Sequence, residues 1–277
     1  MSPFPKSGMS PFLMRIQGLM IDLDGTISEV GKAIPGAVEA LQRLREAGLP
    51  LRFVTNTTGR PRRDVLDRIH SLGVDATTEE LFTTTTAAVA WLNARGIHRI
   101  APCVAEATRE DFAEFDFDDK TPQAVVVGDL GSAWTHDILN VAFRQILDGA
   151  ALVALQKGRY WISEQGLTLD AGAWVAALEY ASGVTAHVVG KPNREFFDAA
   201  VASMGLEIDA VAMVGDDIFN DVDGAQRAGA KGILVRTGKF RQDALDKSGV
   251  KPDLIVDSLA DLGQMGSGLE MQHSSKS

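Results

Sequence analysis

Short apolar runs alternate with helical patterns along most of this chain, and this alternation limits the folds that it can adopt. Residues 18–23 form a nearly continuous apolar run, which is typical of a parallel strand covered on both faces. Pro35 opens a helix that ends at Gly48, and residues 51–55 form the next strand. The pattern predicts an α/β fold with a doubly wound parallel sheet and right-handed crossovers.

The middle of the chain contains a second block with the same alternation. Its third strand leads into a hairpin that starts at residues 157–161, and then into a helix at 173–181. We predict a core domain of residues 14–97 and 187–262, with an inserted α/β domain at 98–186. The other predicted strands are 100–104, 124–127, 151–155, 186–190, 210–214 and 232–235. The other predicted helices and helix-like stretches are 62–72, 86–95 with Thr84 or Thr85 as its cap, 109–115 and 134–147.

The two ends are expected to add little to the fold. The first 14 residues repeat Met-Ser-Pro-Phe and lack the basic start and continuous apolar run of a secretory signal. Residues 263–277 are polar and rich in Gly and Ser, which is typical of a frayed tail.

The composition excludes several classes of partner. Lys and Arg number 27 against 37 Asp and Glu, and the resulting net charge of −10 repels a nucleic acid. No apolar run reaches the roughly 18 residues of a membrane span. The single cysteine, Cys103, cannot form an internal disulfide, which fits a reducing cytoplasm. A homodimer is the base-rate expectation for the assembly.

Two carboxylates stand at the end of the first predicted strand. Asp22 and Asp24 lie two residues apart, so an extended chain places them on one side, and Gly25 allows a sharp turn after them. In a doubly wound sheet, ligands bind beyond the carboxyl ends of the strands. Two carboxylates there repel each other unless a cation lies between them. A solvated Asp-Gly turn explains this motif about equally well when it is taken alone.

Two polar motifs follow other predicted strands. Thr55 and Asn56 come directly after the second strand, where Thr-Asn is usually turn and capping chemistry. Lys191 lies between an apolar strand and a helix opened by Pro192, where a single Lys is commonly a surface residue. Neither motif specifies a function alone.

Three carboxylates follow a further buried strand. Asp216 and Asp217 come directly after it, and Asp221 would share a helical face with Asp217. Acidic residues are common near helix N-termini without any ligand. A cluster without basic neighbours favours a hard cation, and Mg²⁺ binds one or two carboxylates together with substrate phosphate oxygens.

The order of these motifs, with Asp first, Thr second, Lys third and paired Asp last, resembles the signature of the haloacid dehalogenase superfamily of phosphohydrolases. The insertion between the Thr and Lys motifs is similar to the large α/β cap, called type two, of its subfamily IIA. The resemblance extends from about residue 18 to residue 240. It is also carried by the segments Phe53-Val-Thr-Asn-Thr57, Lys157-Gly-Arg-Tyr160, Ala177-Leu-Glu-Tyr-Ala181, Val189-Gly-Lys-Pro192, Met213-Val-Gly-Asp-Asp217 and Val235-Arg-Thr-Gly-Lys-Phe240.

This resemblance implies a Mg²⁺-dependent phosphatase that acts on small phosphorylated metabolites through an aspartyl-phosphate. Asp22 would be the nucleophile and a metal ligand. Asp24 would be the general acid and then the general base, with its backbone carbonyl on the metal. Thr55 and the Asn56 backbone would bind the phosphoryl group, and Lys191 would neutralise negative charge. Asp216 would bind the metal directly. Asp217 and Asp221 would hold water molecules or neighbouring groups.

Two other classes of function stay open. A signalling receiver domain also combines an acidic Mg²⁺ pocket with Thr and Lys, although its phosphorylated Asp ends the third strand of a chain of only ~120 residues. A catalytically weak phosphate-binding protein could use the same scaffold, although the retention of Asp22, Asp24, Lys191 and Asp216 argues against it. For the phosphatase, a bulky cap would restrict substrates to small phosphate esters, phosphoramidates or pyrophosphate.

Overall fold

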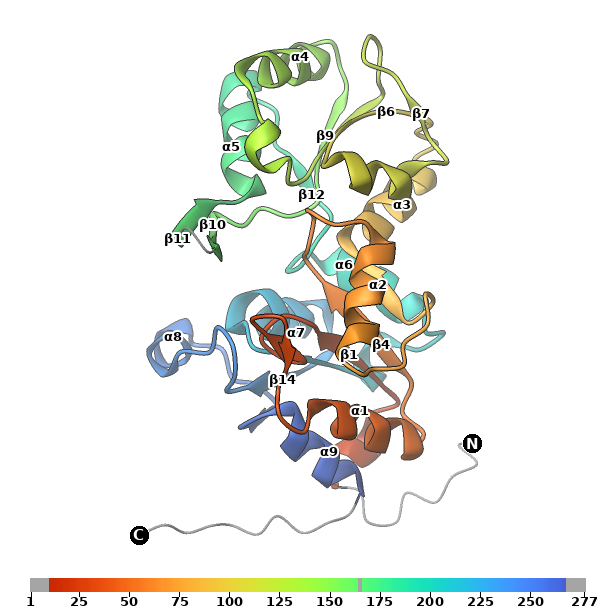
Figure 1. Ribbon diagram of the computed structural model, residues 1–277, viewed down its shortest axis with the longest axis vertical. Helices are drawn as coiled ribbons and strands as arrows, with labels where there is room; N and C mark the ends of the chain where they lie inside the picture. Colours follow the sequence, from red (N-terminus) through yellow and green to blue (C-terminus); the bar gives the residue numbers. More distant parts are fainter. Residues whose placement is uncertain (1–9, 164–165, 268–277) are drawn as a thin grey trace. The chain divides into compact units, whose positions relative to one another are not determined.

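The structure is a computed structural model that describes residues 10–163 and 166–267. The chain forms two compact units, each with its own parallel sheet and helices (Figure 1). The predicted α/β class with parallel sheets is confirmed. The first unit comprises Met1–Thr55, Leu66–Phe82 and Phe197–Ser277, and the second comprises Asn56–Val65 and Thr83–Phe196.

A six-stranded sheet forms the centre of the first unit. Its order is β15-β14-β13-β1-β4-β5, and the pairs from β15 to β4 are parallel. β1 is buried along its whole length, as its apolar sequence predicts. From β1 the chain continues to β4 on one side and later to β13 on the other, so the topological switch point lies between β1 and β13. The strands are β1 (Gly18–Asp22), β4 (Leu51–Thr55), β5 (Leu81–Thr83), β13 (Val211–Gly215), β14 (Lys231–Val235) and β15 (Leu254–Val256).

Helices of the first unit pack on one another and on this sheet. α1 (Ala37–Glu46) and α9 (Leu259–Ser267) lie side by side (Figure 1). Because α9 continues to Ser267, the prediction of a frayed tail is wrong for residues 263–267, and residues 268–277 lie outside the described chain. The unit boundaries fall inside two helices, α2 (Arg62–Ser71) and α6 (Arg194–Ala202). The other elements are η1 (Leu13–Arg15), β2 (Ser28–Glu29), β3 (Lys32–Ala33), η4 (Ile208–Ala210), the π-helix η5 (Ile218–Asp223), α7 (Gly224–Ala228) and α8 (Gln242–Ser248).

The second unit has a five-stranded parallel sheet of order β12-β9-β8-β6-β7. α4 and α5 pack together beside it, with the stacked rings of Trp134 and Trp174 5.3 Å apart in its apolar core. The predicted hairpin is present as the antiparallel pair β10 and β11. The elements are α3 (Thr84–Ala94), β6 (Arg99–Cys103), η2 (Glu106–Phe112), β7 (Asp116–Phe117), β8 (Ala124–Val127), η3 (Gly131–Ala133), α4 (His136–Leu147), β9 (Ala151–Ala154), β10 (Tyr160–Ser163), β11 (Gly166–Leu169), α5 (Ala171–Ser182) and β12 (His187–Val188).

Local capping differs from the sequence-based expectation at α3. Thr83, rather than Thr84 or Thr85, caps the helix by accepting a hydrogen bond from the Thr86 backbone (3.2 Å). Four consecutive threonines offer four similar caps, and only the tertiary contacts select one, because Thr85 donates instead to Asp111 (2.6 Å).

The predicted insert, 98–186, lies wholly inside the second unit. The boundary between a catalytic core and this insert stays a prediction, because compactness alone does not assign function to either unit. None of the helices in the described ranges is long and apolar enough to cross a membrane.

Candidate active site

Three buried carboxylates meet at the carboxyl ends of β1 and β13. Each of Asp22, Asp216 and Asp221 contributes an oxygen, and the three oxygens lie within 4.8 Å of one another. The side chains are almost fully enclosed, with exposed fractions of 7%, 2% and 1%. The cluster therefore lies at the switch point of the sheet, where a doubly wound fold binds its ligands.

The turn after β13 explains how Asp221 reaches this cluster. Gly215 has no side chain, and a Cβ there would collide with the Asp221 carboxylate. Asp217 caps the following π-helix by accepting hydrogen bonds from the backbones of Phe219 and Asn220 (both 3.0 Å). The Asp217 N–H in turn donates to Asp221 (3.2 Å). The paired carboxylates thus have different tasks, since Asp217 shapes the turn while Asp216 and Asp221 face Asp22.

The Asp216 carboxylate lies against two glycines that are far apart in the sequence, Gly25 and Gly238. A Cβ on either Gly25 (φ +90°) or Gly238 (φ +58°) would collide with the Asp216 carboxylate, so both positions need glycine for space and for backbone conformation. The Lys239 N–H donates to Asp216 (2.6 Å), and the Thr237 hydroxyl donates to the Gly25 carbonyl. These contacts fasten the loop after β14 onto the turn after β1 and orient Asp216.

The electrostatics of the cluster favour a bound cation. Burial and the nearby Asp221 carboxylate raise the pKa of Asp216 from 3.8 to about 7. Such a shift indicates that the surroundings of Asp216, Lys239 included, only partly offset the negative charge on this carboxyl group. Buried carboxylate oxygens are the ligands that hard cations such as Mg²⁺ prefer, so the residues present fit a magnesium ion.

Asp24 lies apart from the cluster. Its side chain is about half exposed, at 49%, and pairs with Arg68 of α2, with Oδ1 2.5 Å from Nη2. The same Arg68 nitrogen donates to the Ser28 hydroxyl (2.9 Å). Asp22 thus belongs to the buried cluster, whereas Asp24 pairs with Arg68 outside it.

The Thr and Lys motifs belong to different units. Thr55 ends β4 and is buried beside β1, where Val54 pairs with Asp22. Lys191, with 4% of its surface exposed, lies in the second unit, and its backbone is hydrogen bonded to the side chain of Asn56 (both bonds 2.9 Å). The predicted roles of Thr55, Asn56 and Lys191 toward a phosphoryl group stay predictions.

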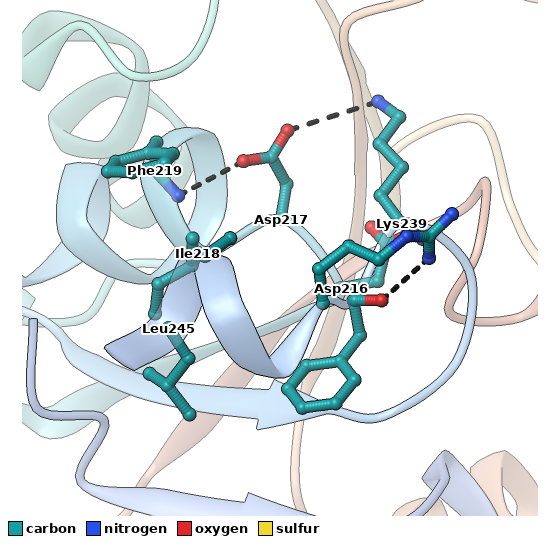
Figure 2. A pocket seen from close by; sticks show the side chains of 9 residues that line it. Asp216, Asp217, Ile218, Phe219, Lys239 and Leu245 are labelled. Carbon is teal, nitrogen blue, oxygen red and sulfur yellow. Dashed lines mark hydrogen bonds and ion pairs between the residues drawn. The ribbon is translucent and has the colours of Figure 1, made fainter. Parts of the chain in front are cut away.

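A small cavity adjoins the cluster. Figure 2 shows Lys239 directed toward Asp217 at its rim, where Nζ and Oδ2 are 4.0 Å apart. The Lys239 side chain is largely exposed, so its partial desolvation, which opposes the charged form, is outweighed by the nearby carboxylates, and these raise its pKa. The cavity measures about 120 Å³ and is lined by Asp216, Asp217, Ile218, Phe219, Lys239, Phe240, Arg241, Ala244 and Leu245.

Sequence reasoning did not assign Arg68, Gly238 or Lys239 to the site. A signal for the last two is present, because Thr237-Gly-Lys239 follows a buried strand at the same sheet edge as the acidic motifs. Arg68 has no comparable signal, since it is one of several basic residues on a helix and only tertiary contacts select it.

Comparisons with known proteins identify the family of this chain. Residues 19–118 match the family described as haloacid dehalogenase-like hydrolase, and residues 188–262 match the one described as HAD-hydrolase-like. Haloacid dehalogenase-like hydrolase domain-containing protein 2 of Bos taurus is 42% identical over 243 residues, which cover 88% of this chain and 93% of that protein.

A second relative and a solved structure are similar over most of the chain. Phospholysine phosphohistidine inorganic pyrophosphate phosphatase of Bos taurus is 38% identical over 270 residues, which cover 95% of this chain and 97% of that protein. The p-nitrophenyl phosphatase from Archaeoglobus fulgidus superposes with a TM-score of 0.85 at 29% identity, over 90% of this chain and 98% of that one. The resemblance inferred from the ordered motifs is confirmed, and this chain belongs to the haloacid dehalogenase-like hydrolase family.

Proposed function

We propose that this phosphatase hydrolyses small phosphorylated metabolites, with Asp22 as its nucleophile and Mg²⁺ as its cofactor. The observation that carries the proposal is the position of Asp22, buried beside Asp216 and Asp221 at the switch point of the sheet. A carboxylate held among carboxylates stays ionised, and so nucleophilic, only when cations offset the local charge.

The metal has a natural place in this arrangement. Asp22 and Asp216, with the backbone carbonyl of Asp24, would bind Mg²⁺ directly, and Asp221 beside them would hold a water molecule or a neighbouring group. When it is bound, the metal stabilises negative charge on the phosphoryl oxygens. Lys191 would neutralise charge on Asp22 and on the phosphate, and Thr55 and the Asn56 backbone would bind the transferred phosphoryl group.

The reaction then divides between two carboxyl groups. A carboxylate oxygen of Asp22 attacks phosphorus, and the bond from phosphorus to the leaving oxygen breaks as Asp24 donates its proton to that oxygen. In the second step Asp24 accepts a proton from a water molecule. The water oxygen bonds to phosphorus, the bond to Asp22 breaks, and inorganic phosphate leaves. Atoms and protons balance over the cycle, because Asp22 is restored as a carboxylate and Asp24 as its protonated acid.

The chemistry of the relatives suggests a range of substrates. One relative is named for phospholysine, phosphohistidine and inorganic pyrophosphate, and a structural neighbour for p-nitrophenyl phosphate. We propose the same classes here: small phosphate esters, phosphoramidates and pyrophosphate. A panel of such compounds, each assayed with and without Mg²⁺, would rank them by kcat/KM.

The proposal is tested by the Asp22→Asn variant. The amide lacks the attacking oxygen but keeps the size of the side chain, so turnover of p-nitrophenyl phosphate should fall by at least ~10³-fold. The matched control is Asp243→Asn, at an exposed i,i+4 pair with Lys247 on α8, which should retain wild-type activity. Near wild-type turnover by a folded Asp22→Asn protein would contradict the covalent mechanism.

A further inference from the structure

Two reciprocal hydrogen bonds join the Asn56 side chain to the backbone of Lys191, 135 positions along the chain. The Lys191 N–H donates to Asn56 Oδ1 (2.9 Å), and Asn56 Nδ2 donates to the Lys191 carbonyl oxygen (2.9 Å). One carboxamide therefore satisfies both backbone groups of a single residue. The pairing also fixes the orientation of the amide, because a flipped group would place donor against donor and acceptor against acceptor.

The surroundings of this contact are tightly packed. A Cβ at Gly190 would lie 2.9 Å from both Asn56 Oδ1 and Thr84 Cγ2, so the absence of a side chain at Gly190 lets the carboxamide reach the chain. Lys191 is 4% exposed, and the Val189 N–H continues the hydrogen bonding to β9 (2.9 Å). The β9 contact thus holds the chain before Lys191, while Asn56 holds Lys191 itself.

We propose that the Asn56 side chain is a positioning residue for Lys191, tying it to the loop that follows Thr55. This rests on the proposed function, in which that loop binds the phosphoryl group and Lys191 offsets its charge. A cation lowers a reaction barrier most when it is already held where charge develops, because it then needs no reorganisation during the step. The role of the Asn56 side chain is separate from that of its backbone.

Asparagine is specifically suited to this contact. Asp at position 56 would keep the shape but replace Nδ2 with an oxygen facing the Lys191 carbonyl oxygen, which removes one bond and adds a repulsion. Ala would remove both bonds. We expect Asn56→Asp and Asn56→Ala each to lower kcat/KM for p-nitrophenyl phosphate by about 10- to 100-fold, the range that misplacement of a catalytic group gives.

A double-mutant cycle separates positioning from a general structural effect. The four proteins are wild type, Asn56→Ala, Lys191→Met and the double variant, each assayed for kcat/KM with saturating Mg²⁺. Lys191→Met should lower kcat/KM by at least ~100-fold. If Asn56 acts through Lys191, adding Asn56→Ala to Lys191→Met should lower activity by less than about 2-fold more. The inhibition constant for inorganic phosphate should show the same dependence.

The matched control is Asn93→Ala in the same unit. Asn93 bonds to Glu114 (2.6 Å) on an exposed surface, and its loss should leave activity unchanged. Thermal unfolding establishes that each variant is folded, and if Asn56→Ala does not fold, the isosteric Asn56→Asp takes its place in the cycle. Wild-type activity in a folded Asn56 variant, or equal losses in both Lys191 backgrounds, would overturn the inference. Full activity of Lys191→Met would instead overturn the role that the proposed function gives to Lys191.

Discussion

Among single residues, Asp24 differs most from its neighbours in the site. It pairs with Arg68 at 2.5 Å and is half exposed, while Asp22, two residues earlier, is buried among carboxylates. A general acid and base must exchange protons with a leaving group and with water, which an exposed carboxyl group can do. Asp22, the proposed nucleophile, needs the opposite setting, in which it is shielded from solvent and close to a bound cation. One short motif thus supplies both environments because the strand ends between them.

We expect Asp24→Asn to separate the two chemical steps. The activated ester p-nitrophenyl phosphate needs little help from an acid, so aspartyl-phosphate should still form on Asp22. Its hydrolysis needs the missing base and should slow by at least ~10²-fold. Rapid quench with intact-protein mass spectrometry should then show a burst of p-nitrophenolate and an accumulated phosphorylated protein.

The Asp22→Asn protein is the control for this experiment, since it should show neither burst nor phosphorylated species. Equal slowing of both steps in Asp24→Asn, without an accumulated intermediate, would show that the acid and base roles are not combined in Asp24.

A structural element can be predicted from the sequence when the residues that determine it lie close together in the chain. The buried strand at 18–22 and the turn at Gly25 are set by residues next to one another, so they could be predicted. The position of the Asp216 carboxylate depends on both Gly25 and Gly238, which lie 213 positions apart in the chain. The position of the Lys191 backbone depends on the side chain of Asn56. Such contacts form only when the strands have taken their places in the sheet, and the strand order of a sheet cannot be read from a local sequence pattern.

The α1–α9 pair provides a prediction about stability. A Cβ at Gly263 would lie 2.5 Å from the Ala40 Cα and 2.6 Å from its Cβ, so the helices approach closely only because Gly263 has no side chain. Replacing Gly with Ala in a helix normally stabilises it by up to about 1 kcal/mol. Here overpacking should reverse the sign, and Gly263→Ala should lower the free energy of unfolding by about 1–3 kcal/mol.

Urea unfolding measures this change, and Glu39→Ala is its control. Glu39 is an exposed residue of α1, so its replacement should change the free energy of unfolding by no more than about 0.5 kcal/mol. A Gly263→Ala protein more stable than wild type would show that the two helices are not in close contact.

On the scale of the whole molecule, the balance of charge links stability to metal binding. The chain carries a net charge of −10, and three buried carboxylates of its first unit add a local concentration of negative charge. Self-repulsion of this kind opposes the folded state. A cation held by the cluster would relieve it, so the metal should contribute to folding as well as to catalysis.

This link predicts how Mg²⁺ and pH act together on thermal stability. Burial and the Asp221 carboxylate raise the pKa of Asp216 from 3.8 to about 7, so the metal-free folded state retains a proton that the unfolded chain has lost. The contribution of Asp216 to stability therefore falls as pH rises from about 4 to 7 and is constant above that range.

Because Mg²⁺ competes with this proton, its stabilisation of the folded state should grow with pH. We expect 10 mM Mg²⁺, added after EDTA treatment and dialysis, to raise the unfolding midpoint by several degrees at pH 7.5 and by much less at pH 5.5, since a ligand at ~100 times its Kd contributes about 2.7 kcal/mol. Other carboxyl groups also titrate over this range, so the Asp216→Asn variant is needed to isolate the contribution of this site. In Asp216→Asn the unfolding midpoint should no longer rise with Mg²⁺. Its remaining pH dependence should be that of the other carboxyl groups alone. An equal Mg²⁺ response in Asp216→Asn, or one independent of pH in wild type, would show that the metal does not bind at these carboxylates.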